Sequence, residues 1–274
     1  MKLNATVFNP DALDKPILLV GPSLGGNVTH QWEHVAQLLR DDARVVFVDL
    51  PGTGVAPVWD DAVEPTLDNI AAGIAEVAQS ALAEAPHDVP VYFAGLSISG
   101  ATALHLARDY DKLFDGVAVV ASAAQVGEPD RWLERAQLVE ESGTQQLVDE
   151  TTKRWFTPAF IAANPGVVDA VMEGVAVADD HSYAQLCRAL ATHDMRDDLS
   201  LLRIPVVLIA GERDSSTPIG NVEQVAESVL RGELHVVDGA AHQVTVAAPT
   251  EVADILRRLV TRGRISRVTS ESVD

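Results

Sequence analysis

The stretch that decides the fold reads Val91-Tyr92-Phe93-Ala94-Gly95-Leu96-Ser97-Ile98-Ser99-Gly100-Ala101. A short β-branched and aromatic run leads into small residues, and a helix-forming pattern follows at once. This order predicts a strand, a sharp turn and a helix, with Ser97 at the apex of the turn. Such a turn requires small neighbours and lifts the serine oxygen above the edge of the sheet. Ser97 is therefore a candidate nucleophile.

Two alternatives apply to this stretch. Serine also occurs at ordinary strand-to-helix turns, where its oxygen only accepts backbone N–H bonds. Ser99 is a second candidate nucleophile, because it also has small residues on both sides and stands where the usual G-x-S-x-G motif has its second glycine. The strand is expected to stop at Gly95, which puts Ser97 at the apex and Ser99 in the first helical turn. Ser97 is the better candidate.

Length and composition indicate a globular protein. The 274 residues suffice for one large α/β domain or for a core with an insertion, and 47% of them are hydrophobic. No apolar run is long enough for a transmembrane helix, and the first residues lack the apolar segment of a signal peptide. Cys187 is the single cysteine, which excludes an internal disulfide and is typical of a reducing compartment. We expect a cytoplasmic protein.

The formal charge of −20 limits the class of partner. Nucleic acids and anionic membrane surfaces both require clustered Lys and Arg, so neither is expected as a partner. A small-molecule substrate fits this composition, and an anionic substrate would need a local basic group. Whether the protein forms a homo-oligomer is left open by the sequence.

Strand patterns alternate with helix patterns along most of the chain. Apolar runs predict strands at residues 5–8, 16–21, 44–50, 91–95, 116–120, 204–211 and 233–237. Helices are expected between them, including one over 66–85 that Thr66 or Asp68 can cap, and a last one over 249–261. This alternation predicts an α/β fold with a mostly parallel sheet and helices on both faces.

The alternation breaks between residues 123 and 202. Helical patterns continue there without a strand pattern, so we expect a helical cap over 123–202, inserted into a core formed by 1–122 and 203–274. Trp132, Trp155 and Phe156 lie in this cap. They are candidates for a pocket wall, and the alternative is that they pack the cap against the core.

A glycine-rich loop follows the strand at 16–21. The loop lacks the spacing of a phosphate-binding loop, which disfavours a nucleotide. In serine hydrolases a loop at this position supplies one backbone N–H of the oxyanion hole. We assign that N–H to Leu24 and the other to Ile98, next to the nucleophile. A plain turn is the alternative.

Asp214 and His242 each follow a predicted strand, as Ser97 does. The carboxyl ends of parallel strands meet at one edge of a sheet, where such folds build their sites. A serine hydroxyl needs an imidazole to take its proton, and the imidazole needs a carboxylate to orient it. Singly, Asp214 could form a turn and His242 could cap a helix. The remaining histidines are expected in a strand, in helices or in surface loops. No cluster has metal-ligand spacing, so neither a metal nor another cofactor is predicted.

These segments together resemble the α/β-hydrolase superfamily, and within it the 3-oxoadipate enol-lactonases. The general similarity lies in residues 95–100, 210–214 and 239–242. The more specific similarity lies in Pro22-Ser23-Leu24-Gly25, Gly127-Glu128-Pro129-Asp130-Arg131-Trp132, Arg154-Trp155-Phe156-Thr157-Pro158-Ala159-Phe160 and Leu186-Cys187-Arg188-Ala189-Leu190. The chain departs from the usual pattern of this family at Pro51-Gly52-Thr53-Gly54-Val55-Ala56, at Ser99 and at the residues after His242. These departures bear on the identity of the substrate more than on the catalytic step.

The resemblance implies a serine hydrolase that opens an enol-lactone, with Ser97, His242 and Asp214 as a triad. It also implies an anionic substrate, for which Arg135 is the candidate partner and Trp132 and Trp155 are candidate pocket walls. A surface pairing of Arg135 with Glu134 or Glu140 is the alternative. Other functions that the sequence leaves open are those of a carboxylesterase, a C–C bond hydrolase, a cofactor-free perhydrolase and a non-catalytic ligand-binding protein.

Overall fold

A computed structural model describes the backbone of residues 1–270 and the side chains of residues 1–261. Its strands are β1 (Asn4–Val7), β2 (Ile17–Gly21), β3 (Arg44–Asp49), β4 (Val91–Leu96), β5 (Gly116–Val120), β6 (Val206–Gly211) and β7 (Gly232–Val237). Its α-helices are α1 (Val28–Leu39), α2 (Leu67–Ala83), α3 (Ile98–Asp109), α4 (Pro129–Ser142), α5 (Val148–Trp155), α6 (Pro158–Ala163), α7 (Pro165–Ala176), α8 (Asp180–Ala191), α9 (Ile219–Ser228), α10 (Val244–Ala247) and α11 (Pro249–Ser270). Short 3-10 helices occupy Thr144–Leu147 and Leu199–Leu201.

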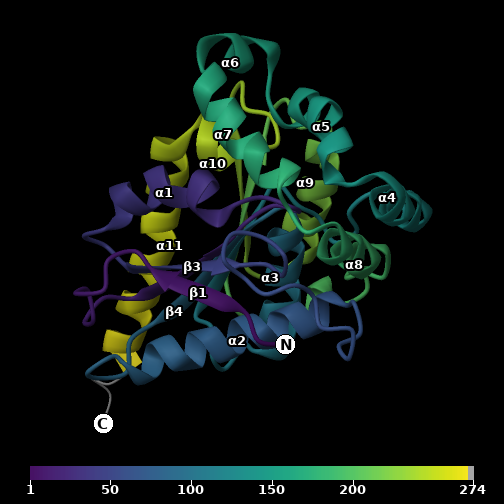
Figure 1. Cartoon of the computed structure of the whole chain (residues 1–274). Coiled ribbons are helices and arrows are strands. Elements are labelled where there is room, and N and C mark those ends of the chain that lie inside the picture. Colours follow the sequence, from purple (N-terminus) through teal and green to yellow (C-terminus); the bar gives the residue numbers. More distant parts are fainter. Residues whose placement is uncertain (271–274) are drawn as a thin grey trace.

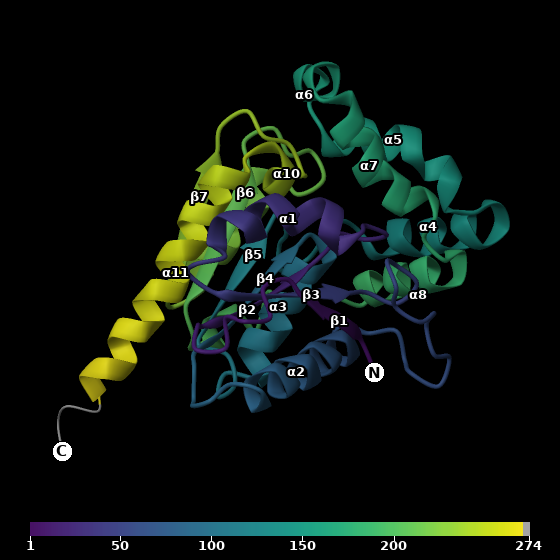
Figure 2. The ribbon, with the colours of Figure 1, turned by 60° about the vertical axis from the view of Figure 1, so that its left-hand side comes forward.

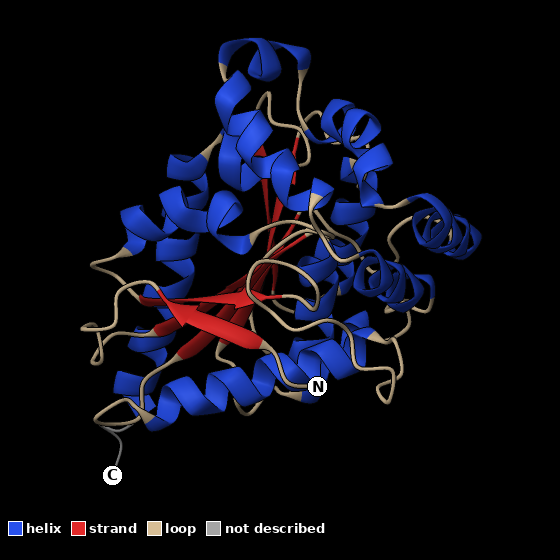
Figure 3. Ribbon diagram, in the orientation of Figure 1, coloured by secondary structure: helices blue, strands red, loops and turns tan. Residues whose placement is uncertain are grey.

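The strands form one sheet in the order β1-β3-β2-β4-β5-β6-β7. β1 runs antiparallel to β3 at one edge, and the other neighbours are parallel. β2 to β6 are buried along their whole length, because helices cover both faces of the sheet (Figure 3). The predicted mostly parallel sheet with helices on both faces is confirmed.

Each face of the sheet has its own hydrophobic layer. On one face, Trp32 of α1 and Leu256 of α11 belong to a cluster with Leu18 of β2. On the other face, Ile70 of α2 and Leu104 of α3 belong to a cluster with Leu19, the next residue of the same strand. Figure 2 shows α11 and α2 on different sides of the strands. Alternate residues of one buried strand thus supply both layers.

The stretch predicted as a cap is helical. Helices α4 to α8 lie between β5 and β6 in the chain and gather at the top and right of Figure 1. Helices α4 and α8 share the large cluster of the sheet through side chains such as Val139 and Leu186. Helices α5 and α7 form a separate small cluster that includes Trp155 and Met172. The division into a core and a cap over 123–202 stays a prediction.

Two details at helix ends refine the expectations. Thr66, not Asp68, caps α2, since its side chain accepts a hydrogen bond from the Asn69 N–H at 3.3 Å. The last helix, predicted to end at Thr261, continues to Ser270. A glycine inside a helix costs only about 1 kcal/mol relative to alanine, so Gly263 does not end it.

The strand order positions the functional loops. β2 pairs with β4 up to Gly21 opposite Gly95, so the loops that follow these two strands leave the sheet side by side. The chain reverses its direction across the sheet here, because β3 lies on one side of β2 and β4 on the other. Open α/β sheets place their sites at such a switch point.

Candidate active site

Ser97 occupies the turn between β4 and α3 in a strained backbone conformation. Its φ is 59° and its ψ is −114°, values that a residue with a side chain rarely adopts. The Ser97 N–H donates to the carbonyl oxygen of Val120 on the neighbouring strand at 2.8 Å, which holds the turn against the sheet. The sharp strand-to-helix turn expected for this stretch is thus present, and Ser97 rather than Ser99 lies at its apex.

The close approach of helix to strand explains the small residues around the turn. A Cβ atom on Gly95 would lie 2.1 Å from the carbonyl oxygen of Ser99, and one on Gly100 would lie 2.7 Å from the Cβ of Ser122. Distances below about 3 Å do not occur for real Cβ atoms. Neither position can therefore carry a side chain without a shift of the backbone.

Asp214 and His242 meet through a hydrogen bond. The Nδ1 atom of His242 lies 2.7 Å from the Oδ2 atom of Asp214, and both side chains are almost completely buried. The loop after β6 orients Asp214 further, because its Oδ1 atom accepts from the Ser216 N–H at 2.7 Å and its Oδ2 atom from the Thr217 hydroxyl at 2.5 Å. An ionised carboxylate only accepts hydrogen bonds, so Nδ1 of His242 carries the proton and donates a hydrogen bond to Asp214. In the neutral ring, Nε2 is then unprotonated and can accept a proton.

The environment of Asp214 keeps its carboxyl group ionised. Burial alone would raise its pKa, but the charge of His242 and the hydrogen bonds from His242 and Thr217 outweigh burial and lower the pKa below the usual value. An ionised carboxylate stabilises the imidazolium that forms when His242 accepts a proton.

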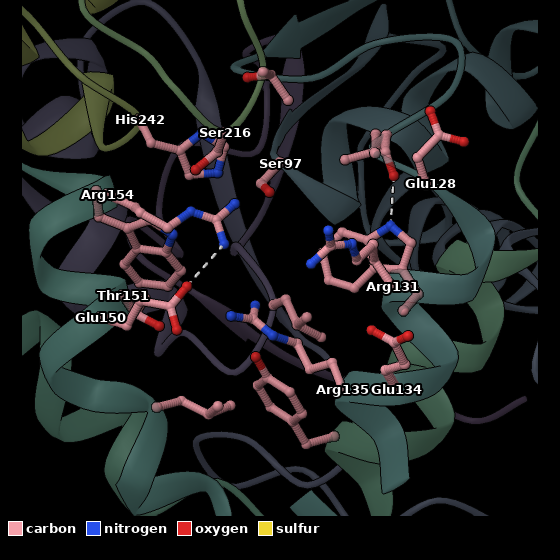
Figure 4. A pocket seen from close by; sticks show the side chains of 18 of the residues that line it. Ser97, Glu128, Arg131, Glu134, Arg135, Glu150, Thr151, Arg154, Ser216 and His242 are labelled. Atoms are coloured by element: carbon pink, nitrogen blue, oxygen red, sulfur yellow. Dashed lines mark hydrogen bonds and ion pairs between the residues drawn. The ribbon is translucent and has the colours of Figure 1, made fainter. Parts of the chain in front are cut away.

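One cavity of about 420 Å³ brings the predicted residues together. Ser97 and His242 line it at the same end (Figure 4), and Leu24, Trp132, Arg135 and Trp155 line it as well. Asp214 lies behind His242, and the Ile98 side chain is buried next to the turn. The cavity combines residues from loops after β2, β4, β6 and β7 with residues of the cap helices.

The expected oxyanion donors have the right local setting. Leu24 lies in the loop after β2, and Ile98 is the first residue of α3. Among the described residues, neither the Leu24 N–H nor the Ile98 N–H donates to a protein acceptor. Buried N–H groups without partners are uncommon and are available to a developing negative charge.

Sequence reasoning missed a hydrogen-bond network that holds the loop of Leu24. The Ser23 N–H donates to Oε1 of Gln31 at 2.9 Å, and Nε2 of Gln31 donates to the Ser23 hydroxyl at 2.6 Å. Nε2 of Gln243 donates to the same hydroxyl at 3.3 Å, and the Gln243 N–H donates to the carbonyl of Trp155 at 3.1 Å. The network links α1, the loop of Leu24, the residue after His242 and the cap. Single glutamines give no sequence pattern that would reveal it.

The cavity wall carries three arginines and three glutamates. Beside Arg135, which was predicted, the wall includes Arg131, Arg154, Glu128, Glu134 and Glu150 (Figure 4). Arg135 stacks over the ring of Trp132 at 5.7 Å, and no ion pair joins it to Glu134 or Glu140 in the part of the chain that is described. Glu140 instead pairs with Arg188 at 2.8 Å. The surface pairing considered for Arg135 is therefore not formed.

Cys187 and His193 carry side chains of types that can react, but neither lines this cavity. Burial raises the pKa of Cys187 to about 12, so its thiol stays protonated at neutral pH. His193, expected in a helix or a surface loop, is instead buried, with its Nδ1 atom 3.0 Å from Nε2 of His105 and its Nε2–H donating to the carbonyl of Ala123 at 3.0 Å. The bond from His193 to Ala123 joins the two ends of the helical insertion, and the contact with His105 joins its second end to α3.

Among the described residues, no group of three or more His, Cys, Asp or Glu side chains is arranged to hold a metal ion. No helix there has both the length and the apolar character needed to cross a membrane.

Comparison with known proteins places the chain in a family. The family model described as "Serine aminopeptidase, S33" matches residues 30–247. The chain is 31% identical over 239 residues to 3-oxoadipate enol-lactonase 2 of Acinetobacter baylyi, covering 86% of this chain and 85% of that protein. It is 25% identical over 234 residues to a pimeloyl-[acyl-carrier protein] methyl ester esterase of Vibrio cholerae, covering 82% of this chain and 86% of that protein.

A solved structure supports the same fold. The enol-lactonase from Burkholderia xenovorans LB400 superposes with a TM-score of 0.82 at 22% identity, covering 96% of each chain. The predicted α/β-hydrolase fold is confirmed, and the relatives are hydrolases. The chain therefore belongs to the α/β-hydrolases, in the family described as "Serine aminopeptidase, S33", and is similar to the 3-oxoadipate enol-lactonases.

Proposed function

We propose that this protein is a serine hydrolase that opens a small enol-lactone bearing a carboxylate, with 3-oxoadipate enol-lactone as the first candidate. The observation that carries the proposal is the common cavity of Ser97 and His242, with Asp214 bonded to the far side of the imidazole. The similarity to enol-lactonases over most of the chain supports the choice of substrate.

The proposed first step forms an acyl-enzyme. Nε2 of His242 takes the proton of the Ser97 hydroxyl as the serine oxygen attacks the lactone carbonyl. The oxyanion of the tetrahedral intermediate accepts hydrogen bonds from the Leu24 and Ile98 N–H groups, each worth about 3 kcal/mol in such sites. The intermediate collapses, the ring C–O bond breaks, and the enol oxygen leaves with a proton from His242.

The second step restores the enzyme. The released enol tautomerises to a ketone while the other end of the substrate stays esterified to Ser97. His242 then removes a proton from water, which attacks the acyl carbonyl, and Ser97 leaves with that proton. The product is the open-chain keto acid, and no cofactor is consumed.

The arginines of the cavity support an anionic substrate. Seven of the thirteen arginines in residues 1–261 form ion pairs, namely Arg44, Arg108, Arg154, Arg188, Arg196, Arg213 and Arg257. Arg131 and Arg135 line the cavity and have no carboxylate within ion-pair distance in the same part of the chain. In a protein of net charge −20, two guanidinium groups without a carboxylate partner offer the charged hydrogen-bond donors that a carboxylate requires, and Glu128 and Glu134 line the same cavity.

Hydrolysis of an open-chain methyl ester is a second candidate. The similarity to a pimeloyl-[acyl-carrier protein] methyl ester esterase favours it, and the same triad would serve it. Turnover of the enol-lactone at a kcat/KM at least a hundredfold above that of methyl pimelate would select the lactonase function.

The test of the proposal compares purified wild-type protein with Ser97→Ala. Wild-type protein should hydrolyse p-nitrophenyl acetate and the enol-lactone, and a fluorophosphonate probe should label Ser97. The variant should lose both properties. Ser122→Ala is the matched control, because it also removes a buried serine hydroxyl, one that forms no hydrogen bond and does not line the cavity. A wild-type protein that neither labels nor turns over esters would instead indicate a non-catalytic ligand-binding protein.

A further inference from the structure

Ser99 has a defined partner at the position where the motif has glycine. Its hydroxyl donates to the carbonyl oxygen of Pro22 at 2.6 Å, and both residues are buried. The distance lies within the usual range for an O–H···O hydrogen bond, and such a bond is stronger when it is shielded from water. With glycine at position 99, the buried carbonyl of Pro22 would lose this donor.

The bond joins the two segments that carry the expected oxyanion donors. Ile98 immediately precedes Ser99, and Leu24 follows Pro22 by two residues. Pairing of β2 with β4 holds these segments together only as far as Gly21 and Gly95. Beyond these glycines the two strands no longer pair. The hydrogen bond from Ser99 to Pro22 joins the two segments there, next to the residues that carry the Leu24 and Ile98 N–H groups.

The surroundings are shaped for the Ser99 side chain. A Cβ atom on Gly21 would lie 2.6 Å from the Ser99 hydroxyl oxygen, so the absence of a side chain at Gly21 makes room for it. The next residue of the loop is held independently, because the Ser23 N–H donates to Gln31 and the Ser23 carbonyl accepts from the Gly26 N–H at 2.9 Å. Ser99 thus fixes the start of the loop, directly after β2.

We propose that Ser99 is a positioning residue, which sets the separation of the Leu24 and Ile98 N–H groups through its bond to Pro22. The inference rests on the proposed hydrolase function. Oxyanion donors act when they lie about 2.7–3.1 Å from the charge that develops in the transition state. A displacement of about 1 Å can lower the rate by roughly a hundredfold. Ser99 itself contacts neither substrate nor reacting atoms.

The test measures p-nitrophenyl acetate hydrolysis by Ser99→Ala and Ser99→Gly. Alanine keeps the Cβ atom and removes only the donor, whereas glycine restores the motif and removes both. We expect kcat and kcat/KM to fall together by roughly tenfold to a hundredfold in each variant, with KM changed by less than about twofold, because only the transition state uses the oxyanion hole. Affinity for a boronic acid, whose tetrahedral adduct on Ser97 mimics that state, should fall by a similar factor.

The matched control is Ser122→Ala. Ser122 is also fully buried and packs beside α3 at Gly100, and its hydroxyl has no hydrogen-bond partner. This variant should keep wild-type kinetics. Wild-type kcat in Ser99→Ala, or a loss of thermal stability with unchanged kcat and boronate affinity, would restrict Ser99 to a packing role and overturn the inference. Wild-type protein without esterase activity would overturn the proposed function itself.

Discussion

His242 and Asp214 are 28 residues apart in the chain and are joined by a 2.7 Å contact between Nδ1 and Oδ2. A second pair, His181 and Asp61, has the same separation of 2.7 Å between Nε2 and Oδ1. The side chains of the first pair are 3% and 0% exposed, and those of the second are 43% and 77% exposed. Exposed ion pairs contribute little, whereas a buried pair fixes the orientation of the ring.

This contrast predicts the effect of removing each carboxylate. Asp214→Asn should lower kcat for ester hydrolysis by roughly ten-thousandfold, because the amide donates to Nδ1 and leaves the proton on the wrong ring nitrogen. Asp61→Asn, the exposed counterpart, should leave kcat unchanged. Steady-state kinetics on p-nitrophenyl acetate would measure both. Equal activity of Asp214→Asn and the wild-type protein would remove Asp214 from the proposed triad.

The arginines of the cavity should discriminate by substrate charge. Arg135→Gln and Arg131→Gln should each weaken kcat/KM for the enol-lactone by roughly tenfold to a hundredfold, since a hydrogen bond to a charged group is worth about 1.5–3 kcal/mol. Neither variant should alter kcat/KM for neutral p-nitrophenyl acetate. Arg196→Gln, an exposed arginine paired with Asp194, serves as the control. An equal effect on both substrates would indicate a structural role for the arginine.

The turn should not tolerate a side chain at Gly95. Gly95→Ala should destabilise the protein by at least about 3 kcal/mol or prevent folding, because its Cβ atom would lie 2.1 Å from backbone atoms of Ser99. Gly220→Ala is the control, because a Cβ atom there meets nothing within 4 Å in the described structure. Chemical denaturation would compare the two variants. Normal stability of Gly95→Ala would mean that α3 can move away from β4.

Buried His193 should make stability depend on pH. Burial first, and then the neighbouring charge of His105, lower the pKa of His193 to about 4 from an ordinary 6.5. The unfolded chain therefore binds this proton at a higher pH than the folded protein, so stability is retained above pH 6.5 and lost as the pH falls towards 4. The loss should be about 3 kcal/mol, at about 1.4 kcal/mol per pKa unit.

His193→Gln tests whether His193 causes this pH dependence. Glutamine can still donate to the carbonyl of Ala123 but does not titrate, so the fall in unfolding free energy between pH 6.5 and 4 should become shallower by a similar amount. Urea denaturation at a series of pH values would measure it. Parallel curves for the variant and the wild-type protein would assign the acid sensitivity to other groups.

Much of the candidate site could be predicted from local sequence. The turn at Ser97 could be recognised because the crowding between β4 and α3 demands small residues within a few positions of the serine. The choice of Ser97 over Ser99 followed from where the strand ends, which is also local. Asp214 and His242 could be named because each follows a strand, and the carboxyl ends of parallel strands share one edge.

Contacts between distant segments were decided by the tertiary structure alone. The bond from Ser99 to Pro22 spans 77 positions, and the contact between His105 and His193 spans 88. Both depend on which strands and helices become neighbours, and hydrophobic periodicity carries no information on that order. The same is true of Arg131, whose place in the cavity wall follows from how α4 packs against α8. The sequence by itself determined the proposed reacting groups and the turn that holds Ser97, because these follow from neighbours in the chain. Only the packing of β2 against β4, with the insertion above them, decided what surrounds those groups.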